Sequence, residues 1–413
     1  MRVLWLSHVI PYPPKAGVLL RAYHLLRGVA TRHDVDLVAF VQRPLLATFY
    51  DDVEQGLEAC YAELASLCRS VRFLPIEKSI RPFGQLRSAA ESLLSSEGYM
   101  AGWLDSDSAR QVLVEVSAAN KYDLMHCDSL SLARFRPLFP DTPATLGHHN
   151  AESHMMNRRA VRERTLLKRW YFHLESRRIA RYEATIAERF ALHISCSELD
   201  SERLGATMPA AKCVAVPNGV DIDYFASGAA IQSSDSLIFV GTLNWYPNID
   251  AMLFLLQQIW PLLRKRVPNV TLDLVGAGAP AELVDIAKAS PGVHLHGFVN
   301  DVRPLIARAA IYVCPIRDGG GTKLKILDAL SMAKCIVAHP VSCEGISVTP
   351  GKTVMYAESP TEFVDTIEAL LRDPERREFI GRAARDLAEN RYSFDRIGKQ
   401  FAELLEGVVK GKE

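Results

Sequence analysis

The sequence predicts an α/β protein with two Rossmann-like domains, and three observations lead to this prediction. The chain has 413 residues, more than one domain usually holds. Short apolar strands alternate with helical periods in both halves, which is typical of parallel sheets joined by right-handed crossovers. A polar stretch without periodicity, residues 221–235, separates the two series. We therefore predict an N-terminal domain at residues 1–222, a C-terminal domain at 223–390, and a helix at 391–413 that packs back on the first domain. A cleft is expected between the two sheets.

The N-terminal domain is predicted from seven strand candidates, with helical periods such as Val18–Thr31 and Val53–Cys68 between most of them. The strands are Val3–Ser7, Val35–Val41, Val71–Pro75, Asp123–Cys127, Ala144–His148, Ala191–Cys196 and Cys213–Pro217. A proline-stiffened loop, Pro11–Gly17, follows the first strand. Open α/β sheets bind ligands at the carboxyl ends of their strands, so this loop is a candidate ligand contact.

The C-terminal domain repeats the pattern with six strand candidates. The strands are Leu237–Val240, Thr271–Val275, Val293–His296, Ile311–Cys314, Cys335–Ala338 and Thr353–Tyr356. The helices are Ile249–Lys265, Ala281–Ala289, Asp301–Ala309, Leu324–Met332, Thr361–Arg372 and Pro374–Glu389. This order predicts a second parallel sheet.

The most informative stretch is Pro315–Leu330, which follows a predicted strand. A strand, a glycine-rich turn and the start of a helix place backbone N–H groups and the positive helix end around an anion. Three consecutive glycines let the backbone approach a ligand closely, and Arg317, Lys323 and Lys325 add positive charge. The stretch predicts a phosphate or diphosphate site, with Asp328 placed to bind a ribose diol. The alternative is a flexible loop before an amphipathic helix with solvated lysines.

Composition and charge exclude several functional classes. Lys plus Arg equals Asp plus Glu at 48 residues each, so the chain has no net positive charge that would favour nucleic acid binding. The eight cysteines form no CxxC pair and several lie in predicted strands, which indicates buried free thiols in a reducing compartment. Residues 1–8 look like a first strand rather than a signal peptide, and no run of about 18 apolar residues occurs. We predict a cytoplasmic protein.

A series of short segments follows one order along nearly the whole chain. They are the Pro11–Gly17 loop followed by Arg21, His148–Glu152, Val216–Asp221, Phe239–Leu243, Val275–Gly278, His296–Val299 and Gly319–Leu330. In this order they resemble the retaining nucleotide-sugar glycosyltransferases of family 4. That family has the GT-B fold, in which two Rossmann-like domains face each other across an interdomain cleft. The Pro-Tyr-Pro-Pro loop and the Gly-Gly-Gly-Thr-Lys-Leu-Lys segment are most similar to bacterial exopolysaccharide and cell-envelope sugar transferases.

The resemblance implies transfer of a sugar from a nucleotide-diphosphate sugar to a hydroxyl acceptor, with UDP and GDP as the first choices of nucleotide. The acceptor is a glycan or a lipid-linked intermediate of surface polysaccharide synthesis. In such enzymes the leaving phosphate deprotonates the incoming hydroxyl on the same face of the sugar. Neither a protein nucleophile nor a cofactor is then required.

The resemblance also implies roles for individual residues. The catalytic residues are His149, which touches the donor sugar, and Arg317 and Lys323, which stabilise the leaving diphosphate. The acceptor contacts are Arg21, His148 and Glu152, and His148 is the alternative to His149 at the sugar. The donor contacts are Gly17, Gly241, Thr242, Asn244, Phe298, Val299, Asp318, Gly319, Gly320, Gly321, Thr322, Lys325 and Asp328. Because backbone groups near Phe298 and Val299 are expected to bind the base, the sequence does not distinguish among nucleotides.

Two departures from the family pattern affect the donor site. Many members carry Glu-x7-Glu, where this chain has Gly320 and Asp328. Many also carry an Arg after the glycine at 241 and a Lys six residues later, where this chain has Thr242 and Asn248. Two alternatives therefore stay open, a non-catalytic partner subunit and a nucleotide-sugar epimerase of the same fold. An NAD-dependent oxidoreductase is disfavoured because no Gly-x-Gly-x-x-Gly follows the first strand.

Three Asp-x-Asp patterns are candidates for metal binding. Asp34–Asp36, Asp105–Asp107 and Asp221–Asp223 each spell Asp-x-Asp, which in other glycosyltransferases binds a divalent cation on the diphosphate. None of them neighbours the glycine-rich loop in sequence. We predict a metal-independent reaction.

One basic stretch points toward the acceptor. Residues 157–182 hold nine basic and two acidic side chains, with Trp170, Tyr171 and Phe172 among them. Such a helical stretch can rest on an anionic leaflet and present a lipid-linked acceptor. The alternative is a solvated helix. Because the stretch is isolated in a neutral chain, it does not indicate nucleic acid binding.

Overall fold

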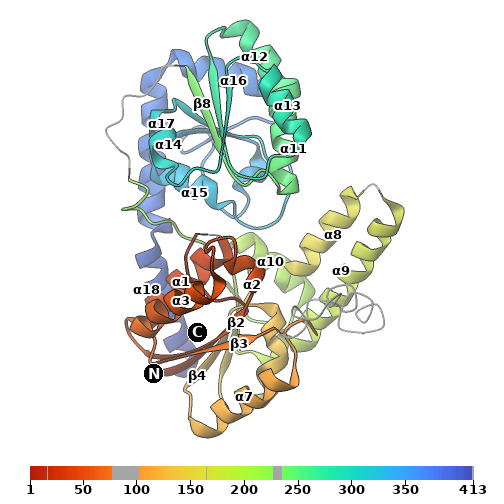
Figure 1. Cartoon of the computed structure of the whole chain (residues 1–413), viewed down its shortest axis with the longest axis vertical. Helices are drawn as coiled ribbons and strands as arrows, with labels where there is room; N and C mark the ends of the chain where they lie inside the picture. The colour runs from red at the N-terminus through yellow and green to blue at the C-terminus, as the bar shows by residue number, and fades with distance from the viewer. Residues whose placement is uncertain (16, 77–101, 164, 227–234, 412–413) are drawn as a thin grey trace. The chain divides into compact units, whose positions relative to one another are not determined.

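The computed structural model describes the chain apart from residues 16, 77–101, 164, 227–234 and 412–413. It divides into two compact units, an N-unit of residues 1–217 and 395–413 and a C-unit of residues 218–394. Each unit is built on one parallel sheet, and Figure 1 shows the helices around each sheet. Most of the predicted linker, residues 227–234, lies outside the described residues.

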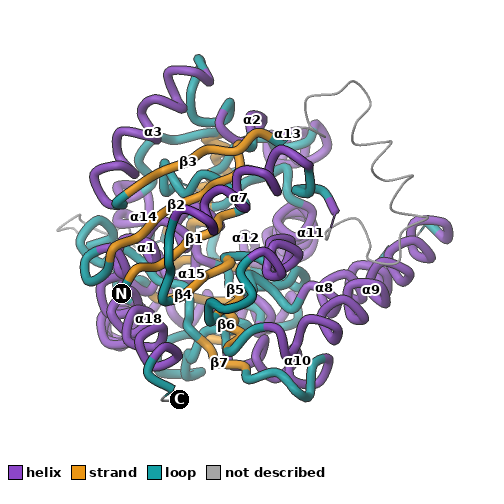
Figure 2. The backbone as a smooth tube through the Cα atoms, turned by 90° about the horizontal axis from the view of Figure 1, so that it is seen from below, coloured by secondary structure: helices purple, strands orange, loops and turns teal. Residues whose placement is uncertain are grey.

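The N-unit sheet has seven strands in the order β3-β2-β1-β4-β5-β6-β7, which can be followed in Figure 2. The strands are β1 Arg2–Ser7, β2 Asp34–Val41, β3 Ser70–Pro75, β4 Leu124–Cys127, β5 Ala144–Gly147, β6 Leu192–Ser195 and β7 Cys213–Ala215. The helices are α1 Gly17–Ala30, α2 Arg43–Leu46, α3 Val53–Leu67, α7 Asp107–Ala119, α8 Glu152–Arg162, α9 Leu166–Ile186, α10 Glu198–Thr207 and α18 Phe394–Val409, with 3-10 turns η1 Leu130–Leu138 and η2 Ala187–Arg189.

Alternate residues of β1 build the two faces of the N-unit core, because successive side chains of a strand point to opposite sides. Val3 and Trp5 pack with α1, α3 and α18, whereas Leu4 and Leu6 pack with α7 and η1. The Trp5 ring lies 5.9 Å from the ring of Phe401 on α18. The C-terminal helix α18 is therefore part of the N-unit core.

The C-unit sheet has six strands in the order β10-β9-β8-β11-β12-β13. The strands are β8 Ser236–Val240, β9 Thr271–Val275, β10 Val293–Gly297, β11 Ile311–Cys314, β12 Cys335–Ala338 and β13 Met355–Tyr356. The helices are α11 Tyr246–Phe254, α12 Trp260–Arg266, α13 Ala281–Ala289, α14 Arg303–Arg308, α15 Leu324–Ser331, α16 Pro360–Arg372 and α17 Pro374–Leu387, with a 3-10 turn η4 Pro340–Cys343 and π-helical segments η3 Leu255–Ile259 and η5 Ala388–Tyr392. The helix predicted at Ile249–Lys265 thus starts earlier, at Tyr246, and contains a π-helical stretch.

Both predicted parallel sheets are confirmed, and the predicted strand ends agree with the structure to within two residues. All eight cysteines are free; seven are buried and Cys213 is partly buried. Among the residues that the structure describes, no helix combines the length and the apolar character needed to cross a membrane.

Candidate functional site

Each sheet has one point where the strand order reverses. In the N-unit β1 lies between β2 and β4, and in the C-unit β8 lies between β9 and β11. At such a switch point the crossovers leave to opposite sides, so the carboxyl ends of the strands are open to a ligand. His8 and Asp128 follow β1 and β4, and loops starting at Gly241 and Pro315 follow β8 and β11. The two switch points are the candidate sites.

In the C-unit the loops after β8 and β9 are joined by backbone hydrogen bonds. The amide of Gly241 donates to the Val275 carbonyl at 2.9 Å, and the amide of Leu243 donates to the Ala277 carbonyl at 2.8 Å. Gly276 has a φ of +155°, and a Cβ at this residue would overlap the Gly241 carbonyl. Only glycine fits this contact. The end of the C-unit sheet therefore presents closely packed backbone to a ligand.

Lys325, on α15, brings positive charge to this backbone. Its Nζ donates to Asn248 Oδ1 at 2.8 Å and lies 4.4 Å from the centre of the Phe239 ring. A Cβ on Gly241 would overlap the same Nζ. Asn248 in turn donates to the Thr242 carbonyl at 2.7 Å. Position 248, where the resemblance led us to expect a lysine, thus receives an amine from another helix.

The glycine-rich loop after β11 is closed by Lys323. Its Nζ donates to the carbonyl of Gly319 at 2.9 Å and to that of Gly321 at 3.1 Å. These glycines have φ values of +100° and +69°, which side-chain-bearing residues rarely adopt. Helix α15 starts directly after Lys323 and has no side-chain cap at its N-terminus. The amide of Ile326 donates to the Lys323 carbonyl at 2.9 Å, so the two amides before it, of Leu324 and Lys325, are the ones that face a ligand or solvent.

Arg317 lies in the same loop but is paired with a carboxylate. Its guanidinium donates to Asp250 on α11 at 2.9 and 3.2 Å, and it lies 4.1 Å from the centre of the Phe254 ring. A ligand phosphate would have to compete with Asp250 for this side chain. The structure therefore offers Lys325 as the cation nearest the loop after β8.

Burial shifts the titration of two groups on α15. It lowers the pKa of Lys325 to about 8 and raises the pKa of Asp328 to about 7, although the Lys325 charge opposes the second shift. Desolvation disfavours the charged form of each group. A bound anion would favour the charged amine of Lys325, and a diol donating to Asp328 would favour its carboxylate.

The other predicted donor contacts in the C-unit lie around these groups. Phe298, after β10, is 76% exposed, Val299 is partly buried, and Asn244 is exposed beside Gly278. Asp318 and Thr322 belong to the glycine-rich loop, and Asp318 is buried. Thr242 is exposed on the loop after β8. These residues all follow β8, β10 or β11, which places them at one edge of the sheet.

In the N-unit, His8 and Asp128 form a pair that the sequence analysis missed. His8 Nδ1 lies 2.9 Å from Asp128 Oδ1, the His8 amide donates to the same oxygen at 3.1 Å, and Ser7 Oγ donates to Oδ2 at 2.6 Å. Burial would raise the pKa of Asp128, but His8 and the Ser7 hydroxyl outweigh burial and lower it to about 2. The sequence could have indicated this pair by position, since His8 and Asp128 each directly follow a predicted strand.

The adjacent residues His148 and His149 have different surroundings. His148 Nε2 lies 3.0 Å from Nδ1 of the buried His193, whereas the His149 ring lies 5.2 Å from the His8 ring. Burial lowers the pKa of both, that of His149 to about 3, so both imidazoles are neutral at ordinary pH. The N-unit switch point thus brings together His8, Asp128 and His149, while His148 faces the interior.

The remaining site residues predicted in the N-unit are Arg21, Glu152 and Gly17, and each has a structural place within the unit. Arg21, only 6% exposed, donates to the carbonyls of Val216 and Pro217 at 2.9 and 3.1 Å. Glu152 is buried at the start of α8, and burial raises its pKa to about 7. Gly17 is the first residue of α1.

Comparison with known proteins finds a family match within the C-unit. Residues 234–373 match the family model described as glycosyl transferases group 1. The chain is also similar to the crystal structure of Anabaena Alr3699/HepE in complex with UDP and glucose, with 18% identity, 98% of this chain and 100% of that chain covered, and a TM-score of 0.65. Sucrose-phosphate synthase from Thermosynechococcus elongatus matches over 100% of both chains with 14% identity and a TM-score of 0.71.

This chain has the GT-B fold, and its residues 234–373 are similar to the group 1 glycosyl transferases. Among curated proteins, it is 23% identical over 380 residues to an uncharacterized 44.6 kDa protein in the cps region of Klebsiella pneumoniae, with 89% of this chain and 90% of that protein covered. It is 26% identical over 227 residues to a GDP-mannose-dependent α-(1-6)-phosphatidylinositol monomannoside mannosyltransferase of Mycolicibacterium smegmatis, with 50% and 59% covered. The GT-B fold expected from the sequence is confirmed.

In this GT-B protein each Asp-x-Asp pattern has partners of its own. Asp36 accepts from Arg2, Arg69 and Ser70, Asp105 pairs with Arg110 and Arg134, and Asp221 accepts from the amides of Asp223 and Tyr224. Among the described residues, metal-ligand spacing is found at His8, Asp128 and His149, whose ligand atoms lie within 4.8 Å of one another.

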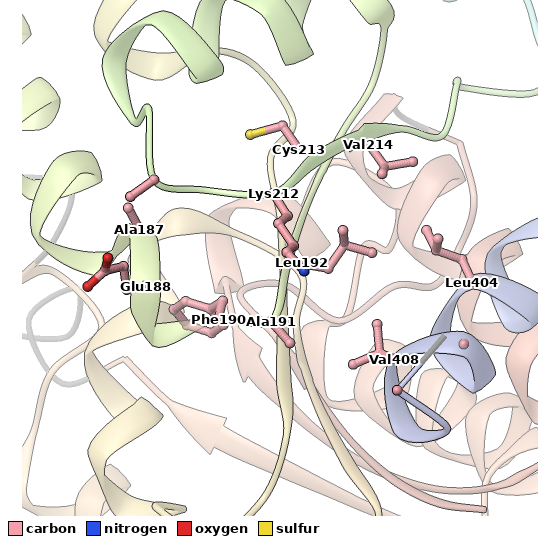
Figure 3. A pocket seen from close by; sticks show the side chains of 13 residues that line it. Ala187, Glu188, Phe190, Ala191, Leu192, Lys212, Cys213, Val214, Leu404 and Val408 are labelled. Atoms are coloured by element: carbon pink, nitrogen blue, oxygen red, sulfur yellow. The ribbon is translucent and has the colours of Figure 1, made fainter. Parts of the chain in front are cut away.

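A cavity of about 710 Å³ lies elsewhere in the N-unit of the GT-B protein, and Figure 3 shows the side chains that line it. It is bounded by η2, by the first residues of β6 and β7, Leu192 and Cys213, and by Leu404 and Val408 of α18. These residues stand at the amino ends of the strands, whereas His8 and Asp128 follow carboxyl ends. The cavity is therefore separate from the switch point.

Proposed function

We propose that this protein is a retaining glycosyltransferase that moves a sugar from a nucleotide-diphosphate sugar to a hydroxyl acceptor without a metal ion. The observation that carries the proposal is the partly buried Lys325 amine held against Gly241 at the C-unit switch point. A diphosphate bound there would meet this amine, the N–H groups at the start of α15 and the glycine-rich loop. These groups stabilise the charge that develops as the bond to the sugar breaks.

UDP or GDP is the proposed nucleotide of the donor. Supporting this, solved relatives contain UDP with glucose or with GlcNAc, and the mycobacterial relative is GDP-mannose-dependent. The test is thermal stabilisation by UDP, GDP, ADP and their sugar conjugates, with and without EDTA. At about 100 times its dissociation constant a ligand adds roughly 2.7 kcal/mol to the free energy of unfolding. No stabilisation by any member of the panel would argue against the donor site and for a non-catalytic partner subunit.

Retention of anomeric configuration is tested on the product. The anomeric proton coupling in the NMR spectrum of the first-formed product reports its configuration before it equilibrates. We expect the configuration of the donor sugar, with a rate insensitive to EDTA. A donor-only incubation distinguishes an epimerase, which changes the donor sugar without any acceptor, from a transferase, which needs one.

The proposed acceptor is a glycan or lipid-linked intermediate of surface polysaccharide synthesis, used at the inner face of a membrane. The relative in the cps region supports this choice. Figure 1 shows α8 and α9 as a hairpin that extends from the N-unit. Near its turn Val161, Leu166, Leu167 and Trp170 are 65%, 75%, 74% and 59% exposed. A cluster of apolar side chains with this much exposure is typical of a surface that contacts a membrane or another protein.

Basic residues surround the exposed apolar side chains of the hairpin. Lys168 and Arg169 are exposed beside Leu167 and Trp170, which suits an anionic lipid surface. Some basic residues of the stretch serve the hairpin itself: Arg159 stacks on Phe172 at 4.3 Å and Arg178 pairs with Glu175 at 3.1 Å. Arg164 lies outside the described residues, and the side chain of Arg162 is not described.

Co-sedimentation with vesicles containing phosphatidylglycerol tests the membrane surface. We expect the wild-type protein to bind these vesicles better than neutral ones, and Leu166→Ser with Leu167→Ser to lose most of the binding. Val114→Ser, which changes an exposed side chain on α7, is the matched control. Equal binding by the double variant and the control would contradict the proposal.

A further inference from the structure

We propose that the N-unit binds one divalent transition-metal ion, such as Zn²⁺, through His8, Asp128 and His149. One ligand atom of each side chain lies within 4.8 Å of those of the other two. The site lies wholly in the N-unit, at the carboxyl ends of β1, β4 and β5, which are neighbours in the sheet and can be followed in Figure 2. The ion has no part in the transfer step of the proposed function, which needs no metal.

The arrangement of the strands brings the three side chains together. His8 and Asp128 directly follow β1 and β4, and His149 is the second residue after β5. The three strands pair in parallel up to these ends. A Cβ on Gly147 would lie 3.0 Å from the Asp128 carbonyl oxygen, so this glycine lets β5 end close to Asp128. The backbone therefore fixes the separations of the three side chains.

His8 and Asp128 already have the separation of two ligands of one ion. His8 Nδ1 lies 2.9 Å from Asp128 Oδ1. Zinc binds nitrogen and carboxylate oxygen at about 2.0–2.2 Å, so two neighbouring ligands of one zinc ion are roughly 3 Å apart. The proton of the hydrogen bond between His8 and Asp128 leaves Nδ1 when the ion binds, because only an unprotonated nitrogen is a ligand.

His149 supplies a lone pair that the protein itself does not use. Its Nε2 is buried and has no hydrogen-bond partner among the residues that the structure describes. The ring also makes a hydrogen bond to the backbone of Asp128, which must therefore involve Nδ1. Metal-binding histidines commonly donate their other ring N–H to a backbone carbonyl or a carboxylate. A buried polar atom without a partner is costly, and a metal ion would give Nε2 a partner.

The Asp128 carboxylate is held in place for a role as a ligand. Its Oδ2 accepts from Ser7 Oγ at 2.6 Å, and its Oδ1 accepts from the His8 amide at 3.1 Å. Carboxylates that bind metals are ordinarily oriented by such hydrogen bonds. Because the two oxygens of a carboxylate offer about four lone pairs, these bonds leave room for an ion. The Asp128 side chain is 5% exposed and that of His8 is 15% exposed, so the site lies just below the surface.

The chemistry of the three ligands selects the kind of ion. Imidazole nitrogens with one carboxylate suit Zn²⁺ and related transition metals, whereas Mg²⁺ and Ca²⁺ prefer a shell of oxygen ligands. Structural zinc sites are usually closed by four protein ligands. Three protein ligands therefore predict an ion that keeps at least one water molecule.

Calorimetric titration of the full-length protein with ZnCl₂, after treatment with EDTA and dialysis, tests the site without any substrate. We expect one Zn²⁺ per chain and no comparable binding of MgCl₂. His8→Gln and His149→Gln should each weaken Zn²⁺ binding by more than the loss of an outer partner does. Ser7→Ala removes such a partner of Asp128, and its loss should cost about 10–100-fold. Thermal melts of the metal-free variants check that they fold.

Two control variants test other zinc ligands of the chain. His294→Gln removes an exposed histidine of β10, and Cys213→Ser removes a partly buried cysteine. Both should bind Zn²⁺ as the wild type does, and Co²⁺ bound in place of Zn²⁺ should show no thiolate charge-transfer band. Affinity that is unchanged in His149→Gln, or lost in Cys213→Ser, would overturn the proposal.

The bound ion has a consequence for turnover, which rests on the proposed function. An ion that occupies His8 and His149 prevents both imidazoles from contacting a substrate. We therefore expect saturating Zn²⁺ to lower the rate of transfer and EDTA to restore it, while EDTA leaves the rate of the metal-free protein unchanged. A rate unaffected by saturating Zn²⁺ would contradict this inhibitory role.

The outcomes separate the inference from the proposed function. A protein that binds no Zn²⁺ but is stabilised by UDP or GDP contradicts the metal site and leaves the function intact. A protein that binds Zn²⁺ through His8 and His149 but is stabilised by no nucleotide contradicts the function and leaves the metal site intact. Transfer that requires Zn²⁺ would contradict both the metal-independent reaction and the inhibitory role.

Discussion

The two switch points of this molecule are built in different ways. In the C-unit the loops after β8 and β9 press backbone against backbone at Gly241 and Gly276, and one lysine enters from α15. In the N-unit single side chains from separate strands, His8, Asp128 and His149, form the group. Backbone N–H groups suit a diphosphate, which is the same in all nucleotide-sugar donors. A group of side chains suits contact with one particular proton or hydroxyl of a substrate.

Charge is also handled differently at the two sites. In the C-unit burial pushes Lys325 and Asp328 toward their neutral forms, with pKa values of about 8 and 7. In the N-unit the charge and hydrogen bond of His8, with the Ser7 hydroxyl, keep Asp128 ionised in spite of burial. The C-unit site therefore gains most from a ligand that restores its charges, while the N-unit pair is already organised without one. The following predictions test this difference.

The largest expected effect is the loss of the C-unit amine. Lys325→Met should lower kcat/KM roughly 10²–10³-fold, by analogy with the removal of one donor to a developing anion. Steady-state kinetics with the identified donor would measure it, and Lys265→Met on α12 is the control for loss of one exposed lysine. A larger loss in Arg317→Ala or Lys323→Ala than in Lys325→Met would move the phosphate contact to the glycine-rich loop.

The next effect tests the backbone contact in the C-unit. Gly276→Ala should lower the free energy of unfolding by about 3 kcal/mol, because its Cβ would overlap the Gly241 carbonyl. Gly297→Ala, where a Cβ meets nothing within 4 Å but φ is +67°, should cost about 1 kcal/mol. Urea denaturation of both variants measures the difference. Equal stabilities would mean that the loops after β8 and β9 separate easily.

In the N-unit, Asp128→Asn should cost about 2 kcal/mol at pH 7, because the charged carboxylate accepts from Ser7 and His8. Since the folded pKa of about 2 lies below the unfolded value of about 3.9, this stabilisation is present above pH 4 and is lost as pH falls toward 2. Thermal melts of wild type and variant should converge over that range. A constant gap would mean that the carboxylate charge does not contribute.

The smallest effect has the opposite sign. Asp328 has a folded pKa of about 7, above the unfolded value of about 3.9, so wild-type stability falls as pH rises from 4 to 7. Asp328→Asn should therefore be more stable than wild type at pH 8 and similar to it at pH 4. It should also bind the nucleotide sugar more weakly, which isothermal titration would show. A variant less stable at pH 8 would contradict the proposed cost of burying this carboxylate.

Much of the fold could be predicted because its signals are local. The strands of both sheets were predicted to within two residues, since each is a short apolar run between turn residues. The glycine-rich loop was recognisable for the same reason, because Gly319, Gly320, Gly321 and Lys323 are nearly contiguous. Helix α11 was predicted three residues too late, since Tyr246 and Pro247 precede the periodic part of the helix.

The sequence by itself determined two parallel sheets, their glycine-rich turns and the presence of lysines near one of them. Only the tertiary structure decided which groups meet. His8 and Asp128 are 120 residues apart and become neighbours because β1 and β4 pair in register. Lys325 donates to Asn248, which lies 77 residues earlier in the chain, and Arg317 pairs with Asp250. Both partners are on α11, which belongs to the same unit as α15 and the glycine-rich loop. Contacts between distant segments depend on strand order and helix packing, which local patterns of residues do not encode.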